Sequence, residues 1–240
     1  MSEFPFQSAS LDKIDIYLTP APDPALKERF WAAQSLLPPS RQKKIARYRR
    51  PADQARSLAA GLLLWRFLGV RADGDLTVGP FGQPRLTKGG PCLSLSHSGG
   101  LAGLAVSPEP LGLDLERDQP ELNWARLAQR ILTPRERERL SQWPNPREFT
   151  LAAWTLKESL AKATGRGLTE ELWSVEPLET FGRVTIQGQV WLLGHRLALN
   201  HHVAICVAQG SQPRFWLAES LAQNPRVTPL PTQKLFELAL

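Results

Sequence analysis

The stretch that decides the fold is FTLAAWTLKESLAKATGRG, residues 149–167. Its spacing predicts one helix closed by Gly165 and Gly167, because glycine suits the left-handed turn that ends a helix. At about 3.6 residues per turn, one side of this helix should face the core. We expect the core side to hold Ala152, Leu156, Leu160 and Ala163, and the opposite side Trp154, Lys157, Glu158, Ala161 and Lys162.

Glu158 and Lys162 lie one turn apart on this helix, so an acid and a base project together. Alone, such a pair is typical of a solvated surface ion pair that contributes little energy. A second acidic segment, residues 111–117 (LGLDLER), gives the pair another meaning.

Residues 111–117 alternate as a strand does, with side chains on opposite faces in turn. We expect Asp114 and Glu116 to share a face with Gly112, whose missing side chain leaves room for a ligand. Two such carboxylates repel unless solvent or a cation lies between them, and hard oxygen ligands suit Mg²⁺ held jointly with a substrate phosphate. Ordinary acids on an exposed edge strand are an equal alternative. The other face should enter the core with Leu111, Leu113 and Leu115.

The composition is that of a globular protein, with 240 residues, of which 42% are hydrophobic and 22% charged. A net charge of +6 favours an anionic partner. Cys92 and Cys206 have no metal-type spacing, so we expect a reducing, cytoplasmic environment. The N-terminal residues lack the pattern of a signal peptide, and no apolar stretch is long enough to span a membrane, so we expect no membrane partner.

The most basic stretch is RQKKIARYRRPADQAR, residues 41–56. It has three interpretations: a solvated helix face, a nucleic-acid surface, or a compact phosphate site built from several cations. A nucleic-acid surface needs a docking motif and stacking aromatics, and only Tyr48 is interleaved here, so we rank it lowest. Residues 96–100, SHSGG, predict a tight loop between two strands that would cradle a phosphate or another ligand.

The remaining pattern predicts helices and strands in alternating groups. His201 and His202 are adjacent, should face opposite ways on a strand, and are interpreted as structural, whereas His195 has no evident partner. Helices are expected at 24–37, 53–69, 122–132 and 134–143. Strands are expected at 12–19, 76–78, 92–95, 101–106, 173–178, 184–186, 189–193 and 201–207, with a turn at 81–84.

A faint internal repeat links the two ends of this pattern. The strand KIDIYLT, residues 13–19, resembles LGLDLER, with Asp15 over Asp114. Each is followed by helices, the last of which is closed by Gly69 or Gly165. We therefore expect an α+β fold of two similar halves, residues 1–110 and 111–240, the second including a C-terminal tail. A pseudo-two-fold axis should relate the halves, and a ligand cleft should lie between them.

The paired segments GLDLE and WTLKESLAK resemble the signature of the Sfp-type 4′-phosphopantetheinyl transferases, G-[IV]-D-x-E followed by [FW]-[SCT]-x-K-E-[AS]-x-x-K. Three further stretches agree: the basic run at 41–56, FGQPRL at the family's G-K-P turn, and LSLSHSGG at its F-N-x-S-H-S. The resemblance covers residues 41–167, and it departs at Gln83, which replaces a lysine, and Ser94, which replaces an asparagine. The matching positions are Gly112, Asp114, Glu116, Trp154, Thr155, Lys157, Glu158, Ser159 and Lys162.

The resemblance implies an enzyme that moves the phosphopantetheine arm of coenzyme A to a serine of an acyl or peptidyl carrier protein, leaving 3′,5′-ADP. It implies that Asp114, Glu116 and Glu158 hold Mg²⁺, or Mn²⁺, against the pyrophosphate of coenzyme A. Glu158 would also act as general base, directly or through water. Lys162 would stabilise charge on the pyrophosphate and the leaving group.

The resemblance also implies the coenzyme A contacts and the partners. The 3′-phosphate would meet Arg41, Lys44 and Arg56, a second phosphate would meet Ser96 and His97, and Lys157 would be a phosphate or a structural contact. Gln83 would weaken a phosphate or adenine contact. The partner would be an acidic carrier protein docked on residues 122–140, whose Trp124, Leu127, Ile131 and Leu132 are alternatively core.

We expect a monomer that binds no nucleic acid. A relative that has lost activity and only binds coenzyme A is a further alternative, which the intact carboxylates disfavour and Gln83 supports.

Overall fold

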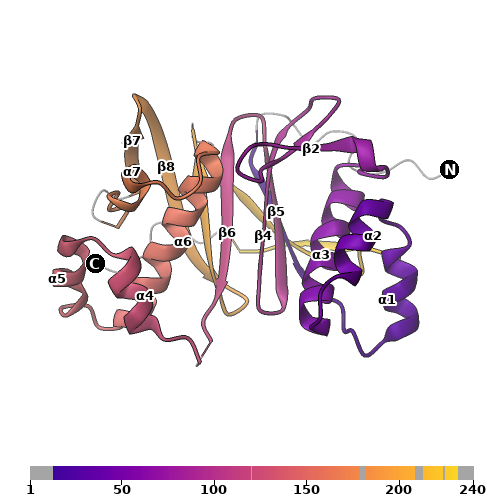
Figure 1. Ribbon diagram of the computed structural model, residues 1–240, viewed down its shortest axis with the longest axis horizontal. Coiled ribbons are helices and arrows are strands. Elements are labelled where there is room, and N and C mark those ends of the chain that lie inside the picture. Colours follow the sequence, from indigo (N-terminus) through magenta and orange to yellow (C-terminus); the bar gives the residue numbers. More distant parts are fainter. Residues whose placement is uncertain (1–12, 120, 179–181, 209–212, 224, 232–240) are drawn as a thin grey trace. The chain divides into compact units, whose positions relative to one another are not determined.

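The computed structural model describes residues 13–119, 121–178, 182–208, 213–223 and 225–231, which form two compact units (Figure 1). Unit 1 comprises the described residues up to Glu109 together with residues 213–223 and 225–231, and unit 2 comprises the described residues from 110 to 208. The expected α+β class is confirmed. No described helix has the length and apolar character needed to cross a membrane.

Unit 1 contains β1 (Asp15–Pro20), α1 (Lys27–Gln34), α2 (Pro39–Ala46), α3 (Pro51–Phe67), η1 (Asp73–Asp75), β2 (Leu76–Val78), β3 (Pro84–Leu86), β4 (Cys92–Ser98), β5 (Leu101–Ser107), β10 (Arg214–Glu219) and β11 (Arg226–Pro229). Its main sheet has the order β11-β10-β1-β5-β4, and β2 pairs with β3 separately. The helices pack on this sheet through α3, where Phe67 stacks on Tyr17 of β1 with ring centroids 3.9 Å apart.

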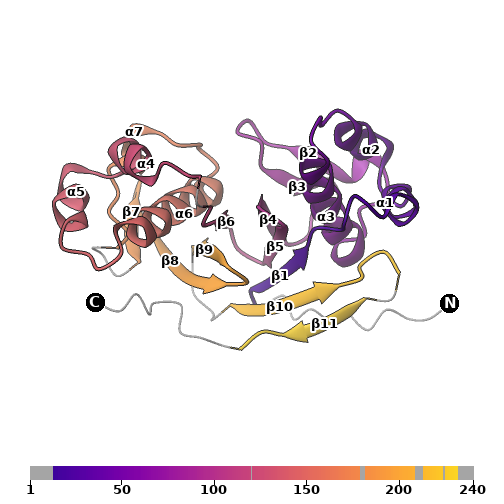
Figure 2. The same ribbon diagram turned by 90° about the horizontal axis from the view of Figure 1, so that it is seen from below.

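The strands β10 and β11 correct the expected boundary, because residues after 210 were assigned to the second half. β10 pairs in parallel with β1, as Figure 2 shows. The Asp15 carboxylate is buried and accepts hydrogen bonds from Arg214 Nε at 2.8 Å, Arg214 Nη2 at 2.5 Å and Trp216 Nε1 at 2.8 Å. A buried charge requires such partners, so the Asp15 contacts stabilise the pairing of β10 with β1. Residues 232–240 of the expected tail lie outside the described residues.

Unit 2 contains β6 (Leu111–Arg117), α4 (Trp124–Ile131), α5 (Pro134–Leu140), α6 (Pro146–Thr164), α7 (Glu170–Trp173), β7 (Arg183–Ile186), β8 (Gln189–Ala198) and β9 (His201–Val207). Its sheet is antiparallel with the order β6-β9-β8-β7, and α6 lies across it (Figure 1). The core between α6 and the sheet includes Leu156, Leu160, Leu193 and Cys206. The expected strand at 173–178 is wrong, because α7 ends there and a turn follows.

The helix α6 begins three residues before the predicted start, at Pro146, after the cap Asn145, whose side chain accepts the Glu148 N–H at 3.2 Å. It ends at the predicted glycine, since Gly165 has φ 68°. Ala152, Leu156 and Leu160 are buried as expected, but Lys157 and Ala161, expected on the open side, are buried too. The reason is that α6 packs against α4 and α5 as well as against the sheet.

Gly112 was expected to leave room for a ligand, but it lies against the backbone of α6. A Cβ atom on Gly112 would lie 1.9 Å from the carbonyl oxygen of Ser159 and 2.5 Å from the Ala163 nitrogen, both on α6. The glycine therefore permits close helix–strand packing, and its space is filled by the α6 backbone rather than by a ligand.

Gly112→Ala is accordingly expected to destabilise unit 2 by at least the roughly 1–3 kcal/mol typical of overpacked cores, because neither backbone can yield easily. Urea unfolding followed by far-UV circular dichroism measures this loss. Gly74→Ala is the matched control, since nothing lies within 4 Å of a Cβ there. Equal midpoints for the two variants would contradict the packing role.

The two units share one connectivity, with the order β1-β5-β4 in one and β6-β9-β8 in the other. When the β4–β5 and β8–β9 turns are matched, Ala204, the partner of Asp114, corresponds to Leu104, the partner of Tyr17. The counterpart of Asp114 is thus Tyr17, and the expected match of Asp15 to Asp114 is wrong.

Candidate active site

Three carboxylates of unit 2 form one electrostatic cluster. Asp114 and Glu116 lie on β6, and Glu158 lies on the α6 face that crosses it. Asp114 is only 4% exposed, while Glu116 and Glu158 are half-buried. The pKa of Glu158 is raised to about 6, first by burial and then by the charge of Asp114, while Lys162 opposes the increase and Glu116 adds a smaller one. The predicted acidic site is therefore brought together by the β6–α6 packing.

Lys162 is the cation of this cluster. Its Nζ donates to Asp114 Oδ1 at 2.6 Å and to the Leu113 carbonyl oxygen at 3.1 Å. A nearly buried carboxylate needs such a partner. Lys162 is more than one half of a surface ion pair with Glu158, because it pairs with the nearly buried Asp114 on the neighbouring strand.

Trp154 is a member of the site that the sequence identified only as a motif position. Its Nε1 donates to Glu116 Oε1 at 3.2 Å. Its indole stacks on Trp173 with ring centroids 5.9 Å apart and an interplanar angle of 27°. The helical spacing places Trp154 on the same side as Glu158, which is the signal that could have pointed to this contact.

A buried histidine pair lies beside Glu116 in the sheet of unit 2. His195 Nε2 and His202 Nδ1 are 3.0 Å apart, so His195 has the partner that the sequence did not reveal. His202 is directly opposite Glu116 in the β6–β9 register. Burial lowers the pKa of His195 to about 3 and that of His202 to about 4, so both rings are neutral near pH 7. The structural role expected for His202 agrees with this burial.

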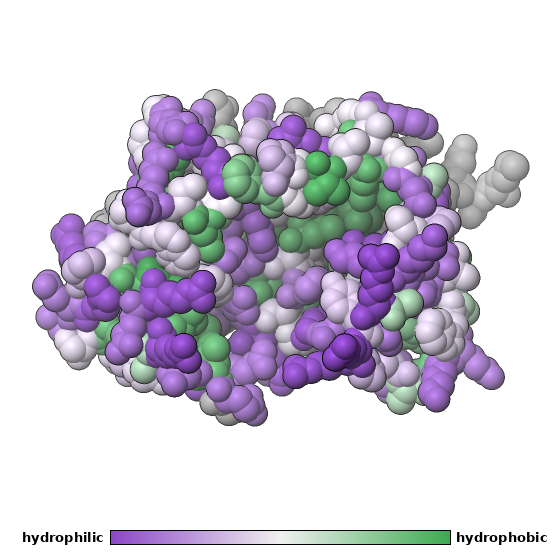
Figure 3. Space-filling view, viewed as in Figure 1, coloured by the Kyte–Doolittle hydropathy of each residue, from purple (hydrophilic) through white to green (hydrophobic). Residues whose placement is uncertain are grey.

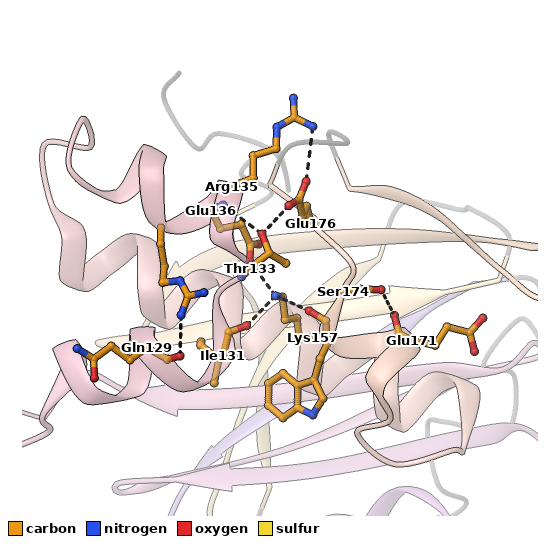
Figure 4. A network of polar contacts seen from close by, with 11 residues as sticks. Gln129, Ile131, Thr133, Arg135, Glu136, Lys157, Glu171, Ser174 and Glu176 are labelled. Carbon is orange, nitrogen blue, oxygen red and sulfur yellow. Dashed lines mark hydrogen bonds and ion pairs between the residues drawn. The ribbon is translucent and has the colours of Figure 1, made fainter.

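Lys157 does not have the geometry of a phosphate contact. Its side chain is fully buried, and Nζ donates to Glu136 Oε2 at 2.8 Å, to the Ile131 carbonyl oxygen at 2.8 Å and to the Trp173 carbonyl oxygen at 3.1 Å (Figure 4). An ammonium with three acceptors inside the core has no donor left for a ligand. We therefore replace the expected coenzyme A contact with the structural role that the sequence left open.

Two of the expected phosphate ligands of unit 1 lie together on α2. Burial lowers the pKa of Arg41, whose Nη2 donates to the Ser57 carbonyl oxygen at 3.5 Å. Lys44 follows one turn later, and its pKa is lowered by partial burial and then by the charge of Arg41. Two neighbouring cations repel each other, and a bound anion would offset this repulsion. Hydrophilic side chains also gather over α2 and α3 on the face shown in Figure 3.

The third expected cation, Arg56, lies on α3 beside the β4–β5 turn. Its Nη1 donates to the Gly99 carbonyl oxygen at 3.2 Å, and its Nη2 pairs with Asp53. The predicted loop at 96–100 is shorter than expected, because Ser96 and His97 belong to β4 and only the glycines turn. Ser96 is buried and His97 is exposed on this strand.

Gln83 lies in the turn between β2 and β3, as predicted. Its carbonyl oxygen accepts the Gly79 N–H at 2.8 Å, and the residue is half-buried. Ser94, the other departure from the family pattern, is buried on β4, in agreement with a structural substitution.

The expected docking segment, residues 122–140, forms α4 and α5. Its apolar residues belong largely to a core cluster that contains Ile131 and Leu132, with Leu127 packed against it. Its exposed surface is instead basic, with Arg126, Arg130, Arg135, Arg137 and Arg139.

The donor set of the carboxylate cluster fits a hard divalent cation in chemistry. Asp114 and Glu116 both raise the pKa of Glu158, so additional positive charge beside these three acids would be stabilising. Among the described residues, no group of three or more histidine, cysteine or acidic side chains is already arranged as a metal cluster. Lys162 supplies the neutralising charge at Asp114 in this arrangement.

The raised pKa of Glu158 predicts a pH dependence of stability. Its pKa in the folded protein is about 6, above the ordinary value of 4.5. In the pH window between these two values, the folded protein keeps a proton that the unfolded chain releases. Stability should therefore fall as pH rises through that window. Urea unfolding of the metal-free protein should show wild type losing stability relative to Glu158→Gln over this range. A constant difference between the two proteins would reject the assigned shift.

Comparison with known proteins agrees with the family resemblance of the sequence motifs. Residues 110–206 match the family model of the 4′-phosphopantetheinyl transferase superfamily. The chain is 30% identical over 227 residues to a putative 4′-phosphopantetheinyl transferase, slr0495, of Synechocystis, covering 89% of each chain. It is 32% identical over 169 residues to the 4′-phosphopantetheinyl transferase HetI of Nostoc, covering 67% of this chain and 70% of that protein. The transferase Sfp of Bacillus subtilis is 24% identical over 202 residues, covering 78% of this chain and 87% of that protein.

The chain belongs to the 4′-phosphopantetheinyl transferase superfamily.

Proposed function

We propose that this protein transfers the 4′-phosphopantetheine group of coenzyme A to a serine hydroxyl of an acyl or peptidyl carrier protein, with Mg²⁺ and with 3′,5′-ADP as the second product. The observation that carries the proposal is the convergence of Asp114, Glu116 and Glu158 from β6 and α6. Membership of the superfamily supports it.

The proposed reaction is a phosphoryl transfer, which depends mainly on positioning and charge neutralisation. The serine oxygen forms a bond to the phosphorus that carries the pantetheine arm, and the bond from that phosphorus to the 3′,5′-ADP oxygen breaks. Mg²⁺ held by Asp114, Glu116 and Glu158 would supply charge neutralisation on the pyrophosphate oxygens.

Glu158 is the proposed acceptor of the serine proton, directly or through one water. Its pKa of about 6 applies without metal, and Mg²⁺ on the same carboxylate would lower that pKa, which favours proton transfer through one water. Lys162 donates from Nζ and would stabilise negative charge on the leaving 3′,5′-ADP, in addition to its contact with Asp114.

Arg41 and Lys44 are the proposed ligands of the coenzyme A 3′-phosphate. We propose the same role for Arg56. The charge of Arg41 lowers the pKa of Lys44, and a bound anion would offset this repulsion, which supports the role. His97 and Ser96 are the proposed contacts of a second phosphate. The positive net charge of +6 would favour encounter with an acidic carrier protein, and the exposed arginines of α4 and α5 offer a complementary surface.

The proposed function is tested by the release of 3′,5′-ADP from coenzyme A. Release should require both Mg²⁺ and an apo carrier protein, and a carrier whose modified serine is replaced by alanine should give none. Release with that serine-free carrier at the same rate would show hydrolysis rather than transfer.

A further inference from the structure

The Glu116 carboxylate accepts a hydrogen bond from a rigid aromatic side chain. The Trp154 indole donates from Nε1 to Glu116 Oε1 at 3.2 Å across the β6–α6 contact. A glutamate carboxylate otherwise rotates broadly about its last torsion. An N–H donor on one oxygen restricts this rotation, so the contact helps to determine how Glu116 presents its charge.

The indole itself cannot turn freely. It stacks on Trp173, with ring centroids 5.9 Å apart, and packs against the cluster formed by Ile131, Leu132 and Phe149. The Trp173 carbonyl oxygen in turn accepts a hydrogen bond from Lys157 Nζ at 3.1 Å. The buried Lys157–Glu136 pair therefore supports Trp173, Trp173 supports Trp154, and Trp154 supports Glu116.

We propose that Trp154 is a positioning residue that orients the carboxylate of Glu116 for a divalent cation. The proposal rests on the proposed function only for the identity of the reaction. Its physical basis is general, since residues that hydrogen-bond a carboxylate ligand orient it and tune its affinity for metal. A purely structural aromatic would need the packing surface of Trp154 but not its N–H group.

The first test observes the hydrogen bond itself by two-dimensional ¹H–¹⁵N spectroscopy. The chain has 8 tryptophans, and the indole signal that disappears in Trp154→Phe belongs to Trp154. That signal should move in Glu116→Gln, and it should move and saturate when MgCl₂ is added to the wild-type protein. The signal of the exposed Trp31 is the internal control. A Trp154 signal that is unchanged in Glu116→Gln would overturn the proposal.

The second test measures metal binding in Trp154→Phe, which keeps an aromatic ring but removes the N–H donor. Electron paramagnetic resonance of Mn²⁺ with coenzyme A present should show a dissociation constant raised by about 10- to 100-fold, the range for lost orienting partners of metal ligands. In the transfer assay, the KM for Mg²⁺ should rise while kcat at saturating Mg²⁺ stays near that of wild type. Unchanged Mn²⁺ affinity in folded Trp154→Phe would show that only packing matters.

A closer replacement separates folding from orientation. Site-specific incorporation of benzothienylalanine at position 154 keeps the bicyclic shape and substitutes sulfur for the N–H group. This replacement should weaken Mn²⁺ binding by the same 10- to 100-fold, and it can be measured even if Trp154→Phe fails to fold. Wild-type Mn²⁺ affinity in the benzothienylalanine protein would overturn the proposal. Because the spectroscopic and Mn²⁺ measurements need no carrier protein, they stand even if the wild-type protein shows no transfer, which would reject the proposed function alone.

Discussion

Glu158→Gln is expected to reduce phosphopantetheine transfer by about 10²- to 10⁴-fold, the range for loss of a positioned general base. Glutamine has the same shape but cannot accept the serine proton, and its neutral amide is a weaker cation ligand. The fold should tolerate the change, because burial already disfavours the charged form of Glu158 and raises its pKa to about 6. Initial rates and urea unfolding of the same preparation measure the two effects.

The matched control for Glu158→Gln is Glu170→Gln, which removes an exposed carboxylate from the first turn of α7 in the same unit. It should keep wild-type activity. Asp114→Ala should lose activity as Glu158→Gln does. Near-wild-type turnover in folded Glu158→Gln would contradict both the metal assignment and the proposed base.

Lys157→Met is expected to lower the free energy of unfolding by about 3–5 kcal/mol, as removal of one partner from a buried ion pair does. The Glu136 carboxylate would remain fully buried, where burial raises its pKa and Lys157 is the main opposing influence. Unlike Glu158→Gln, this change acts inside the core. Thermal and urea unfolding measure the loss, and the exposed Arg130→Met on α4 is the control that should show little change.

A second substitution distinguishes an unpaired charge from lost packing. Glu136→Gln added to Lys157→Met should recover much of the stability, because no charge is then left in the core. Glutamine also preserves the contact in which the Glu136 side chain accepts the Thr133 N–H at 2.9 Å. If the double variant were as unstable as both single losses together, the ion pair would not be the cause.

Local sequence patterns were sufficient for the acids of the site. Asp114 and Glu116 share a face because a strand alternates, and Glu158 and Lys162 share a face because a helix repeats, so neither inference needed a tertiary contact. Lys157 was misplaced because a helical wheel assumes one buried side, whereas α6 contacts both a sheet and two helices. Gly112 was misinterpreted for a related reason, since only the packed structure shows the Ser159 carbonyl oxygen against it.

Contacts between distant segments were beyond the sequence pattern. The His195–His202 pair depends on the turn at Leu199 and Asn200, which sets the β8–β9 register. The return of β10 to unit 1 depends on parallel pairing with β1 and on a hydrogen bond between residues 201 positions apart in the chain. Neither the histidine pair nor the β1–β10 pairing can be predicted from a local periodicity of the sequence.

The central claim is that this chain modifies a carrier protein with the phosphopantetheine arm of coenzyme A. Intact-mass spectrometry of apo carrier proteins from fatty acid, polyketide and nonribosomal peptide synthesis, incubated with the protein, coenzyme A and MgCl₂, tests it most directly. At least one carrier should gain the mass of a single phosphopantetheine group, and the gain should vanish with a chelator or with Glu158→Gln. No gain on any of these carriers, with the protein shown to be folded, would contradict the claim.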